Sequence, residues 1–326
     1  MVATAAVAAA FACRPEPGLG SIILTRGGKT HVVDLATCRD RVVARRAPQP
    51  PPFGSPIVTT DGRWRASVRA SGKGRSAKQT IWVTDMRTGR TRPVFSETQY
   101  YKTTGPGETP GPIMLLGWSG DARWIFFMID PGGSASIAAD GLTLQVVSAD
   151  GGRPSRLARM LPYRDYLAWC GGRLMFTGGG IREATHGKRL LVASPPAWRP
   201  RPLVDSPQRA WGSLTCAPDG HSVVAQSQRR SSNPSFFATR WALWRVAVDG
   251  SVRRLTSPPR GHADESPRFS RDGRTLAFVR SRKGVGKLYA FRGGRLLGPI
   301  LSLGYSLGYY GHQDWWASVR WSAARS

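Results

Sequence analysis

The sequence is poor in several residue types, and each shortage narrows what the protein can be. The 326-residue chain has one asparagine, seven lysines and four cysteines, and only 20 acidic residues against 47 basic ones. None of its apolar runs reaches the length of about 20 residues that a membrane span takes. The cysteines show no C-x-x-C spacing, which argues against a zinc site. We therefore expect no transmembrane segment, no metal and no cofactor.

The basic residues are almost all arginine, forty of the 47, and they give a formal net charge of +27. Scarce lysine and asparagine beside abundant alanine, arginine, glycine and proline is typical of a GC-rich genome, so codon usage explains part of this charge. A basic surface nevertheless attracts anionic partners. Electrostatic binding of an anionic polymer, either a wall polymer or nucleic acid, is therefore kept as an alternative function, although charge alone gives only sequence-independent binding.

The N-terminus indicates export. Its first twelve residues are uncharged and mostly apolar, and they end in Ala10-Phe11-Ala12, an A-x-A pattern that is typical of signal-peptide cleavage. We interpret residues 1–20 as a signal-peptide remnant or a flexible N-terminus, and we expect an exported or cell-envelope protein. Cys13 follows the pattern directly, so lipidation and membrane anchoring at this residue is a second reading. A basic n-region is missing, which leaves a start further upstream open.

An internal repeat of about 50 residues organises the rest of the chain. Its clearest copy runs through Ser266–Arg280, Lys287–Phe291 and Arg295–Leu297: an aromatic residue and Ser, an Asp-Gly turn, and three short apolar strands. Asp-Gly is a strong hairpin signal because a type I′ turn requires positive φ. The residue before the turn recurs at gaps of 60, 51, 47 and 53, as Val58, Trp118, Trp169, Cys216 and Phe269. Four strands in each such unit predict the blades of a β-propeller.

The two ends of the chain complete this pattern. Ser21–Thr25, Thr30–Leu35 and Arg41–Ala44 look like a blade without its first strand, and Trp315–Ser322 looks like a first strand with nothing after it. Trp321 lies 52 residues beyond Phe269, in register with the repeat. Joining the ends removes free sheet edges. We predict an all-β, six-bladed propeller of four-stranded antiparallel blades over residues 21–326, with blades at about 21–46 plus 313–322, 55–98, 111–160, 163–204, 209–260 and 264–300.

This repeat resembles that of the TolB-like β-propellers, which carry WD40-like repeats. Thr256, Asp264–Pro267 and Phe269–Gly273 match their pattern most closely, and the resemblance extends from about Ser21 to Ser322. It implies a binding platform or the propeller half of a larger peptidase. No α/β-hydrolase pattern and no N-terminal TolB domain are present in these residues. We therefore expect a non-catalytic, monomeric platform that binds a protein or peptide.

Two similar motifs mark a candidate binding rim. His262-Ala-Asp264-Glu265 and His312-Gln-Asp314 lie 50 residues apart, each just before an inner strand. Segments that lead into inner strands converge on one mouth of the channel, the deepest concavity of a propeller. We predict that His262, Asp264, Glu265, His312 and Asp314 form an acidic rim where a peptide docks. Two other readings stay open: a metal site of His and carboxylate, or polar residues that only satisfy loop backbone.

The sequence does not favour an enzyme. A third repeat-equivalent carboxylate or histidine motif on the rim would favour a channel-site lyase or hydrolase, and only two are found. Gly304-Tyr-Ser-Leu-Gly308 fits the G-x-S-x-G pattern of a nucleophile elbow, but only His312 and Asp314 follow it, in reverse order. We therefore assign no catalytic residue.

The four cysteines allow two disulfides in an exported protein. We predict a Cys13–Cys38 bond if Cys13 is retained, because Cys38 follows the third strand of the first blade and the bond would attach the N-terminal segment there. Cys170 and Cys216 lie on the first strands of successive blades, but their registers differ by one. We expect their side chains on opposite faces, and hence no bond between them.

Overall fold

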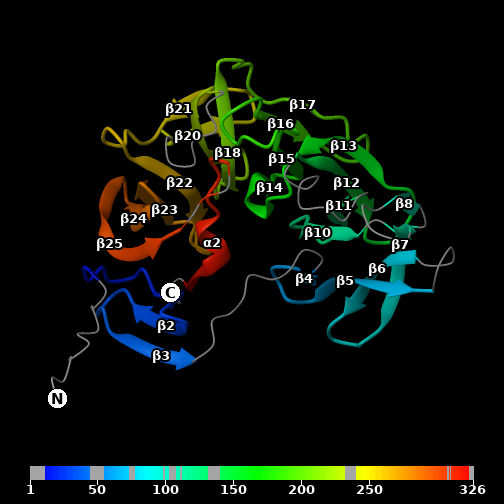
Figure 1. Cartoon of the computed structure of the whole chain (residues 1–326), viewed down its shortest axis with the longest axis horizontal. Coiled ribbons are helices and arrows are strands. Elements are labelled where there is room, and N and C mark those ends of the chain that lie inside the picture. Colours follow the sequence, from blue (N-terminus) through cyan, green and yellow to red (C-terminus); the bar gives the residue numbers. More distant parts are fainter. Residues whose placement is uncertain are drawn as a thin grey trace.

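The computed structural model describes residues 12–44, 55–72, 78–97, 100–102, 108–110, 112–130, 140–231, 240–306, 308 and 310–322. Its strands form six four-stranded antiparallel sheets arranged around a central axis (Figure 1). The predicted shared blade is confirmed, because the strand order of its sheet is β26-β1-β2-β3. Residues 1–11, which hold most of the predicted signal segment, lie outside the described part.

Each blade runs from an inner to an outer strand. Blade 1 contains β26 (Val319–Ser322), β1 (Ser21–Arg26), β2 (Lys29–Asp34) and β3 (Asp40–Ala44). Blade 2 contains β4 (Ile57–Val58), β5 (Trp64–Ser71), β6 (Lys78–Asp85) and β7 (Thr91–Glu97). Blade 3 contains β10 (Ile113–Trp118), β11 (Trp124–Ile129), β12 (Leu142–Ser148) and β13 (Ser155–Met160).

The second half of the ring has the same organisation. Blade 4 contains β14 (Leu167–Cys170), β15 (Arg173–Gly178), β16 (Arg189–Ala193) and β17 (Arg201–Pro202). Blade 5 contains β18 (Arg209–Cys216), β19 (Ser222–Arg229), β20 (Ala242–Ala247) and β21 (Val252–Arg254). Blade 6 contains β22 (Ala263–Phe269), β23 (Thr275–Arg282), β24 (Val285–Arg292) and β25 (Arg295–Tyr305). A hairpin of β8 (Tyr100–Lys102) and β9 (Glu108–Pro110), a short 3-10 helix η2 (Arg164–Tyr166) and one turn of helix α2 (Trp315–Ser318) complete the described elements.

The Asp-Gly turns between the first and second strands share one hydrogen-bonded design. In blade 2 the backbone N–H of Gly62 donates to Thr59 O at 2.8 Å, and the N–H of Trp64 donates to Thr59 Oγ1 at 3.0 Å. Asp61 Oδ1 accepts from the Thr59 hydroxyl and from the N–H of Arg63. Gly62 has φ +74°, and the aspartate before it does not enter the positive region. The hairpin is therefore as predicted, but the expected two-residue type I′ turn is wrong, because the glycine alone supplies the left-handed residue.

Apolar clusters join the blades. Successive side chains along a strand point to opposite faces of its sheet, so each blade sends one set of side chains toward each neighbouring blade. In the described part of the chain such clusters occupy five interfaces, exemplified by Ile81 with Phe127 (blades 2 and 3), Phe126 with Phe176 (3 and 4), Met175 with Val223 (4 and 5), Val224 with Phe278 (5 and 6), and Leu288 with Ile22 (6 and 1). The ring therefore has a distributed core in place of one central core.

The closing strand is held by backbone and side-chain bonds. β26 pairs antiparallel with β1 from Ser21↔Ser322 to Leu24↔Val319. The indole N–H of Trp321 donates to Leu19 O at 2.7 Å, and Val319 packs in the cluster between blades 6 and 1. The C-terminal strand therefore completes blade 1 and its interface with blade 6 together.

The N-terminal disulfide joins Cys13 to Cys38. Cys13 also forms a β-bridge with Leu301 of β25, and the N–H of Arg14 donates to Ile300 O at 2.8 Å. The N-terminal segment thus lies alongside β25, the outer strand of blade 6. Because Cys38 lies in the turn after β2, the disulfide links this segment to blade 1. It therefore reinforces the interface at which the ring closes.

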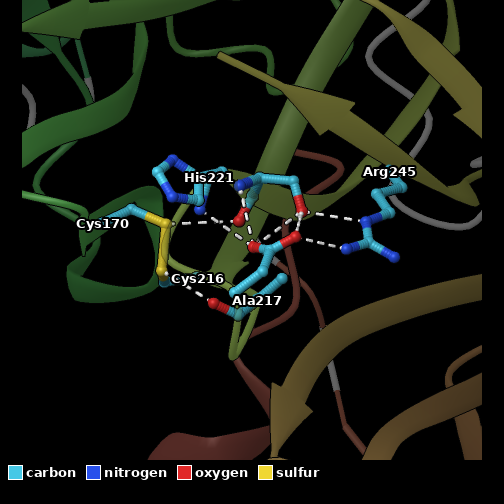
Figure 2. Close-up of a disulfide and its surroundings, with 7 residues drawn as sticks. Cys170, Cys216, Ala217, His221 and Arg245 are labelled. Carbon is cyan, nitrogen blue, oxygen red and sulfur yellow. Dashed lines mark hydrogen bonds and ion pairs between the residues drawn. A yellow bond between two sulfur atoms is a disulfide. The ribbon is translucent and has the colours of Figure 1, made fainter.

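A second disulfide joins Cys170 to Cys216, contrary to the expectation from register (Figure 2). Cys170 packs in the apolar cluster between blades 4 and 5, and Cys216 packs against the same cluster from the other side. Neighbouring blades meet through opposite faces, so a one-residue difference in register turns the two side chains toward each other. Alternation holds within each strand, but the expectation of no bond is wrong because the two cysteines lie on facing sheets of different blades.

Candidate binding site in the central channel

Pockets for small ligands have volumes of about 300–1,000 Å³. The central channel holds a pocket of ≈ 700 Å³. The inner strands of blades 1, 3, 5 and 6 and the helix η2 of blade 4 contribute to its wall. Its lining residues are Leu115, Leu116, Pro162, Tyr163, Arg164, Asp165, Leu214, Thr215, Pro267, Arg268, Asp314, Trp316, Ala317 and Arg320. The pocket therefore combines two carboxylates and three guanidinium groups with aromatic and aliphatic surface.

The segment that leads into the closing strand shapes this pocket. It crosses the channel mouth from blade 4 to blade 6, since Ala184 N–H donates to Tyr310 O at 2.9 Å and Ser266 Oγ donates to Gln313 O at 3.0 Å. Between them the indole of Trp241 in blade 5 donates to Gly311 O at 3.3 Å. Figure 1 shows α2 at the inner side of the ring. The residues just before β26 are thereby fixed to three blades.

His312 lies buried at the centre of this arrangement, 3% exposed. Its ring stacks on Tyr163 with centroids 3.9 Å apart, and Tyr166 meets it edge-on at 4.9 Å. Its Nε2 lies 3.4 Å from Asp165 Oδ1. Burial by itself lowers the pKa of His312, but the nearby carboxylates, Asp165 foremost, outweigh it and the pKa is raised. His312 thus joins the C-terminal segment to the loop before β14.

Asp314 lies between this histidine and the pocket. Its carboxylate caps α2 by accepting from the N–H of Ala317 at 3.1 Å. Burial, and then repulsion from Asp165, raise its pKa to about 6, although His312 and the helix N–H groups oppose the change. Two acidic groups that cannot easily ionise together therefore face the pocket, beside Arg164 and Arg268, whose pKa values burial lowers.

These shifts predict how stability depends on pH. The Asp314 carboxyl keeps its proton up to about pH 6 in the folded protein but only to 3.8, the ordinary value, when unfolded. The folded state binds more protons between these values, so the free energy of unfolding falls as the pH rises through them. His312 acts in the same direction, because a raised pKa gives stability that is present below 6.5 and lost as the pH rises above it.

We expect the free energy of unfolding, measured by urea titration, to fall by about 3 kcal/mol between about pH 4 and about pH 8. Asp314→Asn keeps a side-chain cap for α2 and should remove the part of the slope below about pH 6. An Asp314→Asn variant with the same slope as the parent would show that other groups carry the effect.

The other predicted rim residues have different places. Asp264 is fully buried and forms a two-point ion pair with Arg280, at 2.6 and 2.9 Å. Glu265 Oε2 accepts from Ser281 Oγ at 2.9 Å and from the indole of Trp315 at 3.1 Å. His262 is partly exposed, with Nδ1 3.3 Å from Arg260 O. Of the five, only Asp314 lines the channel pocket; His312 is buried behind it, and Asp264 and Glu265 are held by partners inside the fold and are not available to a ligand.

Sequence reasoning missed Asp165 and the three arginines of the pocket. Asp165 lies just before the inner strand of blade 4, as His312 and Asp314 lie before that of blade 1, so its repeat position was a usable signal. The prediction that the other motif also precedes its inner strand is wrong for Asp264 and Glu265, because β22 already begins at Ala263. Arg268 and Arg320 lie on inner strands, where only the tertiary structure shows which side chains turn to the channel. Among the described residues, no group of three or more His, Cys, Asp or Glu is placed to hold a metal ion.

Comparison with known proteins supports the architecture. No family model and no curated protein matches the sequence. A solved structure assigned as TolB from Agrobacterium tumefaciens aligns over 93% of this chain and 98% of its own, with 16% identity and a TM-score of 0.50. The fold is a TolB-like six-bladed β-propeller.

Two further structures extend the comparison. Prolyl oligopeptidase B from Galerina marginata aligns over 90% of this chain with 12% identity and a TM-score of 0.51, and this chain covers 42% of it. TolB from Acinetobacter baumannii has 16% identity and a TM-score of 0.46 over 88% of this chain, which covers 64% of that protein. At these identities the TolB-like propeller is established as a fold, and the function of this chain has to be argued from its own site.

Proposed function

We propose that this TolB-like propeller is a non-catalytic binding platform whose central pocket takes up a peptide segment of a partner protein. The observation that supports the proposal is the pocket itself: ≈ 700 Å³, with carboxylates and guanidinium groups side by side over apolar surface. A peptide presents N–H and C=O groups together with apolar side chains, so it suits a lining of both charges better than a purely anionic or cationic ligand does. The proposal takes the platform to be a monomer, because one chain forms the whole pocket.

Polar groups around the pocket favour a ligand that brings donors. In the described residues, the hydroxyl of Tyr166 and Nδ1 of His312 are buried without a hydrogen-bond partner, while His312 Nε2 and Asp165 Oδ1 lie 3.4 Å apart as an ion pair without hydrogen-bond geometry. Buried polar groups left unpaired cost about 1–3 kcal/mol each. A backbone amide or a terminal amine placed near Asp165 would recover part of this free energy. The acidic pair of Asp165 and Asp314 therefore replaces the Asp264 and Glu265 pair as the proposed capture site.

A random peptide library displayed on phage tests the proposal. We expect selection on the wild-type protein to enrich peptides whose affinity falls about tenfold or more in Asp165→Asn with Asp314→Asn, since each charge-assisted hydrogen bond contributes about 1.5–3 kcal/mol. His262→Ala is the matched control, because this histidine belongs to the same sequence motif but lies outside the pocket lining. Enriched peptides that bind the double variant as well as the parent would refute the pocket as the binding site.

We propose an exported location for this platform. Two disulfides hold the described structure together, and such bonds persist in oxidising compartments. A cysteine that is bonded to Cys38 carries no thioether lipid, so anchoring through Cys13 is not part of the proposal. None of the helices in the described residues is long and apolar enough to cross a membrane.

Binding of an anionic polymer is a second candidate, supported by a repeated feature of the turns. In five blades the turn between the first and second strands ends in a glycine, or in Ala122 in blade 3, and the next residue is basic. These basic residues are Arg63, Arg123, Arg173, His221 and Arg274. Because these turns share one face of the ring, they would present positive charge to a polyanion. Binding of duplex DNA that collapses steeply with salt and ignores Asp165→Asn with Asp314→Asn would favour this candidate over the peptide platform.

A further inference from the structure

A second pocket of ≈ 450 Å³ lies between blades 5 and 6, away from the channel site. Its apolar wall includes Leu255 of blade 5 and Phe269 and Phe291 of blade 6. Four arginines surround this apolar wall, namely Arg245, Arg253, Arg254 and Arg274. On the blade 5 side, Ala217 directly follows Cys216 of the disulfide, and Arg245 donates to Ser222 Oγ at 2.8 Å on the side away from the disulfide (Figure 2). The pocket is thus an apolar groove with a cationic rim.

The acidic groups near this rim already have partners. Asp219 accepts from Arg245, from Ser222 Oγ and from the N–H of His221. Asp272 accepts from Ser270 Oγ and from the N–H of Arg274. In the described part of the chain, no carboxylate lies within ion-pair distance of the Arg253 or Arg274 side chains, both of which are on exposed residues. The rim therefore retains positive charge that the fold does not neutralise.

The internal repeat shows what another blade places at this position. Arg92 on the outer strand of blade 2 and Arg253 on the outer strand of blade 5 are equivalent positions. Arg92 pairs with Val83, which pairs with Ala66, the third residue of the second strand. Arg253 likewise pairs with Arg245, which pairs with Val224, the third residue of its second strand. Arg92 reaches across to blade 3, where its guanidinium bonds Ala149 O and forms an ion pair with Asp150 at 2.9 Å.

Blade 6 offers Arg253 no such carboxylate. The turn that corresponds to Ala149–Gly152 is shortened to Gly293 and Gly294, which have no side chains and open space beside them. At the interface of blades 3 and 4, the same turn carries Trp198, whose ring packs on Trp124 at 5.0 Å. At the 5–6 interface this turn therefore supplies neither the carboxylate that Asp150 provides between blades 2 and 3 nor the aromatic ring that Trp198 provides between blades 3 and 4, and the arginines line open space.

We propose that this groove binds an amphipathic anion: a carboxylate or phosphate carried on an aromatic or aliphatic body. The anionic group would take the place that the Asp150 carboxylate has at the 2–3 interface, paired with Arg253 and Arg274, and the apolar body would lie on Phe269 and Phe291. Arginine binds carboxylate and phosphate through two parallel hydrogen bonds, so the rim accepts either group. This site is independent of the channel pocket, and its occupation requires no peptide there.

Titration of the labelled full-length chain with phenyl phosphate, followed by amide NMR, tests the site. We expect the backbone amides of Gly273 and Gly294 to shift together on binding. The double variant Arg253→Ala with Arg274→Ala should weaken binding about tenfold. Each exposed charge pair contributes about 0.7 kcal/mol, and the two together amount to the change of about 1.4 kcal/mol that corresponds to a tenfold change in affinity. Gly293→Asp should weaken it too, because φ +55° accepts aspartate and the new carboxylate would pair with the arginines as Asp150 does.

Matched probes separate the outcomes. Arg156→Ala is the control, since Arg156 is exposed at the position of blade 3 that corresponds to Arg254 and should leave binding unchanged. Phenylpropionate in place of phenyl phosphate shows whether carboxylate or phosphate is preferred, and binding of either supports the site. Equal binding of benzyltrimethylammonium, equal binding of inorganic phosphate alone, or unchanged affinity in the double arginine variant would each overturn the proposal.

Discussion

Removal of residues 315–326 is expected to abolish cooperative folding. The deletion takes away β26, so β1 loses a partner along Ser21–Leu24 and blade 1 is left with an exposed inner edge. It also removes Trp315, Val319 and Trp321 from the places where blades 6 and 1 meet. Thermal unfolding followed by circular dichroism measures the effect. Deletion of residues 323–326, which leaves β26 complete, is the control and should melt within a few degrees of the parent.

Trp315→Ala isolates the largest single contribution in that segment. The ring is 2% exposed and packs so closely on β24 that a Cβ at Gly286 would lie 2.4 Å from it. Its indole N–H donates to Glu265, which is itself buried. We expect the substitution to cost about 4 kcal/mol through the cavity and the lost partner of Glu265. A cost of Trp315→Ala below about 1 kcal/mol would contradict the shared-blade account. So would a cooperative melt of the variant without residues 315–326 at a temperature near that of the parent.

Asp264→Ala is expected to cost about 4 kcal/mol as well, because it leaves a largely buried guanidinium without its carboxylate. Asp264 and Arg280 face each other across β22 and β23, and their side chains are 0% and 13% exposed. The hydrogen bonds that Arg280 donates to Asp264 raise the pKa of Arg280, whose guanidinium also lies 4.8 Å from the Tyr289 ring centre. Because a guanidinium stays protonated in proteins, Arg280 keeps its charge when the carboxylate is removed.

A double-mutant cycle measures this pair. Urea unfolding of Asp264→Ala, Arg280→Ala and the double variant should give a coupling energy of about 2 kcal/mol or more, since removing both charges avoids the unpaired one. Asp264→Leu with Arg280→Met should recover most of the stability. His262→Ala, two residues away and partly exposed, should change stability by less than about 0.5 kcal/mol. Additive single effects would show that the two residues do not act as a pair.

The candidate site was only partly predictable. His312 and Asp314 could be found because they repeat a motif at a fixed place before an inner strand. Asp264 belongs to the equivalent motif but lies on β22 and pairs with Arg280 on the adjacent strand, and Glu265 contacts Trp315. The chain sequence shows where a rim residue lies along its blade, but it does not show which neighbour satisfies its charge. That depends on packing between strands.

The sequence by itself determined the number of blades, the turn positions and the closure by the C-terminal strand, because these follow from local patterns. Strand alternation and Asp-Gly spacing act within a few residues, and the repeat multiplies the signal. Only the tertiary structure decided the Cys170–Cys216 bond, the pocket formed by Asp165 and Asp314, and the arginine groove between blades 5 and 6. Each of these is made by side chains of different blades, and their meeting depends on how whole sheets face one another around the ring.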